Sequence, residues 1–279
     1  MRSIGVDVGV RKGLDLVLMD ERRVPLAVRS HVRPAEIGAF IDEFHPDVVA
    51  IDSPPRWAAT GRSRRTEREL ASCNIQSFNT PSETHGRGNR FFEWMEVGFE
   101  VFRAANEHGF PTYGAGPPKG RAMEVFPHAT TVVLTGTLPP KGVSKRVWRE
   151  RVLRAQGVRT DELTSIDRLD AALASLTGLM ALEGKHFAPG DPQEGVIMLP
   201  VNTLPAKPFR QAAQIPNDVA PLFNYCACGD PDCHALVRGD FAPGHDAKRK
   251  AMLWRRAREG RGSIEELEER GWKLPPEMR

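Results

Sequence analysis

Five acidic residues stand inside apolar segments or at their ends. Asp7 interrupts "SIGVDVG", which otherwise has the composition of a buried strand, and Asp52 ends a second apolar run, "DVVAID". Glu124 lies in a third, "AMEVF". Asp167 and Asp170 stand three residues apart at the start of "SIDRLDAALASLTGLMALEG", which places them on one face of a helix. Carboxylates that gather in this way repel one another and have raised pKa values unless a cation neutralises them.

Carboxylate ligands without a neighbouring His or Cys suit Mg²⁺ or Mn²⁺. Two such ions about 4 Å apart stabilise both the attacking and the leaving oxygen of a phosphodiester. We therefore predict a catalytic magnesium or manganese centre that includes Asp7, Asp52 and Asp170 as metal ligands, with Glu124 and Asp167 as further catalytic candidates.

Each of these acids, taken alone, also has a simpler interpretation. Asp52 precedes Ser-Pro-Pro and suits a turn, Asp167 follows Ser165 and would charge a helix N-terminus favourably, and Glu124 could pair with Arg121. The joint pattern, and the position of Asp7 inside "GVDVG", favour the metal centre.

The elements that would position these acids follow from the apolar periodicity. Residues 4–8, 14–19 and 26–31 predict three strands joined by tight turns, and "PAEIGAFIDEFHP" predicts a helix before the strand "DVVAID". A fifth strand is expected through Phe126, between helices, and "EGVIMLP" resembles a final strand. The order β-β-β-α-β, then a further strand, is that of an RNase H-like α/β domain with a mixed five-stranded sheet flanked by helices. If its first and fourth strands are neighbours, Asp7 and Asp52 meet at the sheet centre.

Basic residues gather close to these acids along the chain. We predict that they form a positive rim that binds the phosphates of nucleic acid. The alternative is a solvated helix face with pairs such as Arg64–Glu67 and Arg65–Glu69. The nucleic-acid-binding candidates are Arg56, Arg64, Arg65, Arg68, Arg87, Lys145 and Arg149, with Lys248 and Arg249 near the C-terminus.

Three of the four cysteines fall in one short window near the C-terminus. Cys226, Cys228 and Cys233 predict a closed, structural zinc site. We prefer His245 as the fourth ligand, because His234 is adjacent to Cys233 and one backbone would have to direct both side chains at one ion. After about residue 200 the sequence contains several prolines and little periodicity, which indicates a domain boundary near residue 210. We therefore expect an RNase H-like domain over 1–210 and a linker with a zinc-binding tail over 211–279.

Composition sets broader expectations. The chain has 279 residues, of which 40% are hydrophobic, and a net charge of +3, which by itself does not imply a nucleic-acid partner. No apolar stretch reaches the roughly 20 residues needed to span a membrane. The N-terminus lacks a signal-peptide pattern, so a cytoplasmic location is expected.

Over residues 1–200 the chain resembles a large prokaryotic family known as domain of unknown function 429. The resemblance rests on "IGVDVG", "VVAIDSPP", "RRTERELASCNIQSFNTPSE", "MEVFPHAT", "KRVWRERVLRAQGV" and "SIDRLDAALASLTG". The last of these is also similar to the closing Asp-x-x-Asp-Ala helix of Holliday-junction resolvases. The resemblance implies an RNase H-like nuclease fold, with Asp7, Asp52, Glu124 and Asp170 at its metal-binding positions.

The function expected from these features is metal-dependent hydrolysis of phosphodiester bonds in DNA or RNA. One alternative is a non-catalytic nucleic-acid-binding or adaptor protein on the same scaffold. A second is an actin-like or sugar-kinase-like phosphotransferase, but such proteins usually have two related domains and a second Gly-rich phosphate loop, and we find no second copy in this sequence.

Overall fold

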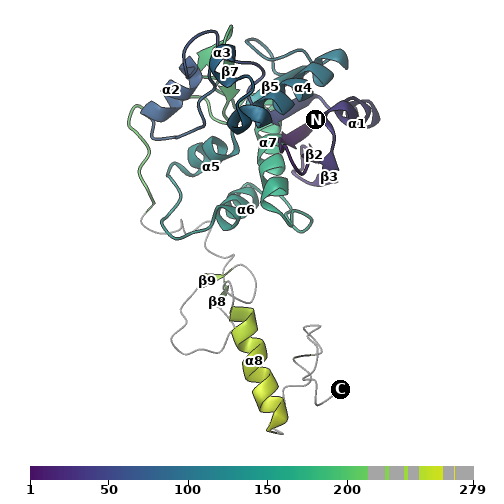
Figure 1. Ribbon diagram of the computed structural model, residues 1–279, viewed down its shortest axis with the longest axis vertical. Helices are drawn as coiled ribbons and strands as arrows, with labels where there is room; N and C mark the ends of the chain where they lie inside the picture. The colour runs from purple at the N-terminus through teal and green to yellow at the C-terminus, as the bar shows by residue number, and fades with distance from the viewer. Residues whose placement is uncertain (213–223, 226–235, 238–244, 260–266, 268–279) are drawn as a thin grey trace. The chain divides into compact units, whose positions relative to one another are not determined.

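The computed structural model describes residues 1–212, 224–225, 236–237, 245–259 and 267 (Figure 1). The chain divides into two compact units, Met1–Val219 and Ala220–Arg279. The predicted zinc ligands Cys226, Cys228 and Cys233 lie outside the described residues.

A mixed seven-stranded sheet forms the centre of the first unit, in the order β3-β2-β1-β4-β5-β7-β6. Strand β1 pairs antiparallel with β2 and parallel with β4, and β4 pairs parallel with β5. The strands are β1 (Arg2–Asp7), β2 (Leu14–Asp20), β3 (Pro25–Val32), β4 (Val48–Asp52), β5 (Arg121–Val125), β6 (Gly190–Asp191) and β7 (Gly195–Met198). The α/β class and the neighbouring positions of the first and fourth strands are as predicted.

The predicted count of five strands is wrong. The expected final strand in "EGVIMLP" is present as β7 and pairs parallel with β5. The two residues of β6, which pair antiparallel with β7, are a further strand that the sequence does not predict. Gly190 and Gly195, the first residues of β6 and β7, have φ values of 114° and 105°, a backbone conformation that favours glycine. Because β6 has only two residues, it cannot show the alternation of apolar and polar residues from which a strand is predicted.

Helices cover both faces of the sheet (Figure 1). Side chains of α1 and α4 pack with Ile4, Val6 and Ile51 on one face, whereas α7 packs with Val48 and Ala50 on the other. The helices of the first unit are η1 (Pro34–Glu36), α1 (Ile37–Phe44), α2 (Arg65–Ser72), α3 (Glu83–Gly86), η2 (Arg90–Phe92), α4 (Glu93–Glu107), α5 (Pro127–Thr135), α6 (Lys145–Ala155) and α7 (Ile166–Leu182).

Helix α7 lies against the sheet at close range because small residues face each other. A Cβ atom added to Gly5 would lie 1.9 Å from the backbone oxygen of Ala171, and one added to Gly178 would lie 2.3 Å from Oγ of Ser3. The hydroxyl of Ser175 donates a hydrogen bond of 2.8 Å to the Ser3 carbonyl, which joins the helix to β1 directly. These contacts hold the N-terminal turns of α7 beside the end of β1.

The segment after β7 packs on the first unit. Phe209 is buried beside Cys73, and its backbone N–H donates to the Cys73 carbonyl. Ala212 donates in turn to the Leu138 carbonyl.

The second unit contains β8 (Asn224–Tyr225), which pairs antiparallel with β9 (Leu236–Val237), and α8 (His245–Arg258). The ammonium of Lys250 lies 5.2 Å from the ring centroid of Trp254 on α8. Among the residues that the structure describes, no helix is both long and apolar enough to cross a membrane.

Candidate metal centre

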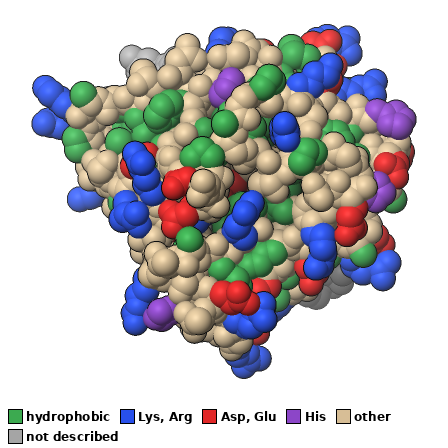
Figure 2. Space-filling view, turned by 90° about the horizontal axis from the view of Figure 1, so that it is seen from above, with side chains coloured by type: hydrophobic (Ala, Val, Ile, Leu, Met, Phe, Trp, Pro, Cys, Tyr) green, Lys and Arg blue, Asp and Glu red, His purple; other side chains and the backbone are tan. Residues whose placement is uncertain are grey.

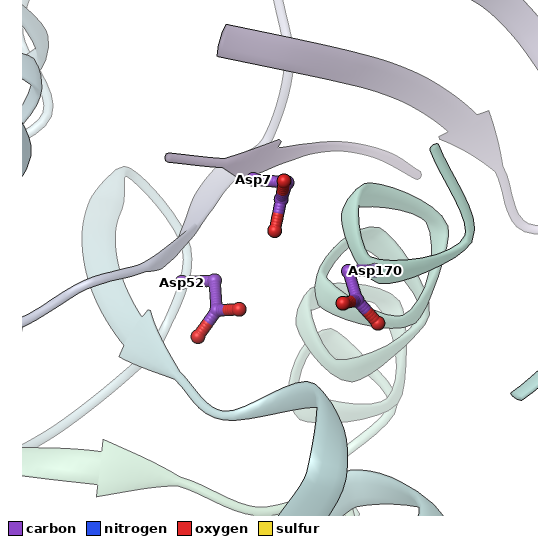
Figure 3. A group of neighbouring side chains, drawn as sticks. All are labelled: Asp7, Asp52 and Asp170. Carbon is purple, nitrogen blue, oxygen red and sulfur yellow. The ribbon is translucent and has the colours of Figure 1, made fainter. Parts of the chain in front are cut away.

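Three of the predicted acids converge at the carboxyl ends of β1 and β4. Asp7 and Asp52 are the last residues of these parallel strands and lie directly opposite each other in register. Asp170 on α7 completes the group, and one carboxylate oxygen from each residue lies within 4.8 Å of the other two. Figure 3 shows the three side chains turned toward a common space between the strand ends and the helix. We call Asp7, Asp52 and Asp170 the acidic cluster.

The start of α7 decides which of its two acids joins the cluster. Ser165 caps the helix by accepting a hydrogen bond of 3.1 Å from the backbone N–H of Arg168. Asp170 follows in the second turn and is buried against the sheet. Asp167, one turn earlier, lies near the surface and pairs with Lys12 at 3.4 Å. The structure therefore brings Asp170, and not Asp167, into the acidic cluster.

Burial is the main electrostatic feature of the acidic cluster. It raises the pKa of Asp7 well above its usual value, and the neighbouring charges of Asp52, Asp170 and Asp167 raise it further. Burial and then the charge of Asp170 raise the pKa of Asp52 in the same way. For Asp170, burial outweighs the nearby Arg149 and raises the pKa to about 7. Burial and mutual repulsion therefore both oppose ionisation of these carboxylates.

Arg149 on α6 is the cation closest to this charge in the described structure, and its Nε forms an ion pair with Oδ1 of Asp170. When all three carboxylates are ionised, they and Arg149 together carry a net charge of −2. One divalent cation would neutralise that charge.

Glu124 does not join the acidic cluster. It lies opposite Ile51 in the register of β5 and β4, so its side chain emerges on the same face as Ile51 and on the opposite face from Asp52. There it accepts two hydrogen bonds of 2.6 Å from Nη1 and Nη2 of Arg64. The alternative partner considered from the sequence, Arg121, is not the one observed.

A cavity of about 670 Å³ opens beside the acidic cluster. Asp52 and Asp170 line it together with Lys145, Arg149 and His128. Burial, and then the charges of Arg149 and Lys145, lower the pKa of His128 to about 4, so this imidazole is neutral at pH 7.

A family model for proteins of unknown function, DUF429, matches residues 5–194, a span that contains the acidic cluster and all of the cavity lining except Ile197. This chain belongs to the DUF429 family. No curated protein matches it.

The predicted basic rim of this DUF429 protein is only partly assembled around the cavity. Lys145 and Arg149 line it as expected. Arg64 also lines it, but its side chain is only 1% exposed and is held by Glu67 and Glu124, so it is a buried structural cation and not a surface contact for phosphate. The predicted helix-face pairs Arg64–Glu67 and Arg65–Glu69 both form, at 3.0 and 2.6 Å.

The remaining predicted contacts lie elsewhere. Arg56, Arg68 and Arg87 are exposed and do not line the cavity; Arg68 donates to the Ser63 carbonyl, and Arg87 pairs with Glu83. On the face drawn in Figure 2, basic side chains are scattered among hydrophobic and acidic ones.

The second unit contains the other predicted contacts and the predicted zinc site of this DUF429 chain. Arg249 is half-buried on α8, and the side chains of Lys248 and His245 lie outside the described residues. The zinc site therefore stays a prediction.

Sequence reasoning missed the aromatic part of the cavity lining. Phe78, Phe91, Trp94 and Phe126 all face this space, as does His128. The signal was present in "NRFFEWM", where three aromatic residues fall within four positions. Nothing in that segment indicates that Phe78, more than ten residues earlier in the chain, lies beside it.

Proposed function

We propose that this DUF429 protein is a metal-dependent phosphodiesterase that acts on nucleic acid through an RNase H-like active site. The observation that carries the proposal is the acidic cluster at the edge of the sheet, open to a cavity that also presents Lys145 and Arg149. Acids alone would repel a phosphate. Acids that hold a divalent ion beside the cations of the same cavity attract one.

The chemistry of the acidic cluster fits a hard divalent cation. Its donors are carboxylate oxygens from Asp7, Asp52 and Asp170, and the net charge of −2 that remains after Arg149 matches Mg²⁺ or Mn²⁺. When bound, such an ion would stabilise the charge that develops on a phosphodiester during hydrolysis.

The chain's own groups would position the substrate around that charge. Lys145 is exposed at the cavity and donates to a phosphate oxygen without losing another partner. Arg149 is held by Asp170 and offers its remaining N–H groups to the same or the next phosphate. His128, neutral at pH 7, accepts a hydrogen bond from a water or a sugar hydroxyl in the cavity.

One observation favours a second candidate, a nucleic-acid-binding protein without turnover. The ion pair between Arg149 and Asp170 is also what a purely structural acid would form. In that case the acidic cluster would bind no ion, and nucleic acid would bind equally well with and without divalent cations. The two candidates are separated by measuring metal binding as well as cleavage.

The decisive experiment compares wild type with Asp7→Asn. Calorimetric titration with Mn²⁺ should show tight binding to wild type and loss of that site in the variant. Hydrolysis of single-stranded and duplex DNA and RNA in Mg²⁺ or Mn²⁺ should fall by at least about a hundredfold, since removal of a charged ligand typically weakens a metal site severely.

Asp161→Asn is the matched control. Asp161 is an exposed acid that pairs with Arg159 at 3.8 Å and does not line the cavity. It should leave both Mn²⁺ binding and hydrolysis unchanged. Cleavage by Asp7→Asn at the wild-type rate on every substrate would refute the assignment of the active site.

A further inference from the structure

Two aromatic side chains stand exposed at the same cavity. Phe78 is 63% exposed and Phe91 is 57% exposed, and they are the only exposed aromatic residues among those the structure describes. Both line the cavity beside the acidic cluster, although one comes from the segment between α2 and α3 and the other from η2. Single exposed apolar side chains are common on proteins, but their meeting at one charged cavity is not explained by the fold.

The two rings are held in place by each other and by Trp94 at the start of α4. The ring centroids of Phe78 and Phe91 are 5.6 Å apart with an interplanar angle of 76°, and those of Phe78 and Trp94 are 6.1 Å apart. Such edge-to-face contacts stabilise aromatic pairs. We call Phe78, Phe91 and Trp94 the aromatic wall. Its rings are ordered by mutual contact while large parts of two of them stay open to solvent.

We propose that the aromatic wall binds an unpaired nucleobase, so that the substrate of this site is single-stranded nucleic acid. The inference rests on the proposed function, which it deepens by naming the substrate class. The same cavity holds groups for each part of a nucleotide: the aromatic wall for the base, Lys145 and Arg149 for the phosphates, and the acidic cluster for the ion at the scissile bond.

A base must be unpaired to use this wall. In a duplex, both faces of each base are covered by its neighbours, whereas a single strand offers a free face to an aromatic ring. A cavity of about 670 Å³ is within the size range of sites for small organic groups, so it can receive a base and its sugar. An apolar peptide would satisfy the rings but would leave Lys145 and Arg149 facing it without an anion.

The test measures binding by fluorescence anisotropy to the full chain in Mn²⁺, with probes that carry hydrolysis-resistant phosphorothioate linkages, so that the acidic cluster can bind its ion and no cleavage interferes. Three labelled probes of equal length are compared: a single-stranded oligonucleotide, the same strand annealed to its complement, and an abasic sugar-phosphate strand. Wild type should bind the single strand at least about fivefold more tightly than either of the others, because stacking on aromatic side chains contributes about that factor per base.

Variants of the aromatic wall then test whether these rings cause the preference for the single strand over the abasic strand. Phe78→Ala and Phe91→Ala should each reduce the ratio of single-strand to abasic affinity toward one, while Phe78→Trp, which keeps an aromatic face, should retain it. The control is Leu26→Ala, which removes an exposed apolar side chain on β3 that does not line the cavity, and it should leave the ratio unchanged. Thermal melting of each variant verifies that it is folded.

Several results would overturn the inference. Equal affinity of wild type for the normal and abasic strands, or alanine variants that keep the full preference, would show that no base stacks there. A mononucleotide that competes as strongly as the oligonucleotide would refute a strand as the substrate. The proposed function can fail separately: loss of base preference in Phe78→Ala without any hydrolysis by wild type would retain the base site and reject the phosphodiesterase.

Discussion

Replacing Asp7 by Asn should stabilise the metal-free protein at neutral pH. One carboxylate oxygen of Asp7 lies within 4.8 Å of one oxygen from each of Asp52 and Asp170, and the charges that shift the pKa of Asp7 are those of other carboxylates. At an effective dielectric constant of about 20, two unit charges at that separation repel by about 3 kcal/mol. Partial protonation of the neighbours reduces the repulsion, so we expect a gain of about 1–3 kcal/mol in the free energy of unfolding.

The effect has a defined dependence on pH. The folded-state pKa values of Asp7, Asp52 and Asp170 are raised above the values of an unfolded chain, and that of Asp170 reaches about 7. The folded state therefore binds more protons than the unfolded state between about pH 4 and pH 7. Wild-type stability without metal should fall as the pH rises through this interval. For Asp170 alone, the shift from 3.8 to about 7 sets a ceiling of about 4 kcal/mol.

The assay is thermal unfolding of the full chain in metal-depleted buffer at pH 5 and pH 8, followed by the same melts in Mn²⁺. In metal-depleted buffer at pH 8, Asp7→Asn should melt above wild type by about 2–4 °C for each kcal/mol gained, as expected for a unit of this size. At pH 5 the difference should shrink. Mn²⁺ should raise the melting temperature of wild type and reverse the order, because binding to the folded state alone stabilises it.

The outcome that refutes this reasoning is simple to state. If Asp7→Asn melts below wild type at pH 8 without metal, the Asp7 carboxylate already has a stabilising partner. Repulsion among the carboxylates of the acidic cluster would then not destabilise the folded protein. Asp161→Asn, at an exposed acid, should shift the melting temperature little at either pH.

Three further changes test the surroundings of the acidic cluster. Glu124→Gln should lower the free energy of unfolding by about 3 kcal/mol, because it leaves the buried Arg64 with one acidic partner fewer. Hydrolysis per folded molecule should persist. Abolished hydrolysis with an unchanged melting temperature would contradict this prediction. Gly5→Ala should cost about 1–3 kcal/mol or more in urea denaturation, since its Cβ would overlap the Ala171 carbonyl, and a neutral result would show that α7 can shift away. Lys12→Ala, which removes one exposed ion pair, should change the same measurement by less than about 1 kcal/mol, and a larger loss would mean that this surface pair contributes to folding.

Much of the fold was predictable because its elements are strongly periodic. The apolar runs that contain Asp7 and Asp52 form adjacent parallel strands, and the small-residue helix that contains Asp170 packs on them. Parallel strands place their carboxyl ends at one edge, so two acids at the ends of neighbouring strands must meet there. Strand order therefore predicts that Asp7 and Asp52 meet. Whether Asp167 or Asp170 joins them depends on how α7 packs on the sheet, which strand order does not fix.

The role of Glu124 could not be predicted, because it depends on strand register. A shift of one residue in the pairing of β5 with β4 would turn its side chain to the face of Asp52, and the sequence contains no feature that fixes that register. The role of Arg64 could not be predicted either, because it precedes α2 in a segment rich in charged residues, where an exposed side chain is expected. In the structure its side chain is buried and pairs with Glu124 on β5.

Register and burial together explain why four similar acids have different roles. Asp7, Asp52 and Asp170 face one space on the α7 side of the sheet, and the one arginine that pairs with them leaves a charge to be balanced. Glu124 emerges on the other face, where Arg64 makes two hydrogen bonds to it. Burial raises the pKa of Glu124 as well, although its pairing with Arg64 lowers it. An acid that already pairs with a buried guanidinium has little to gain from a metal ion, whereas acids that mainly face one another have more to gain. The proposed metal ligands therefore differ from Glu124 in their pairing with arginine, and not in being carboxylates. The side chain of Glu124 is turned to the other face of the sheet, where Arg64 pairs with it.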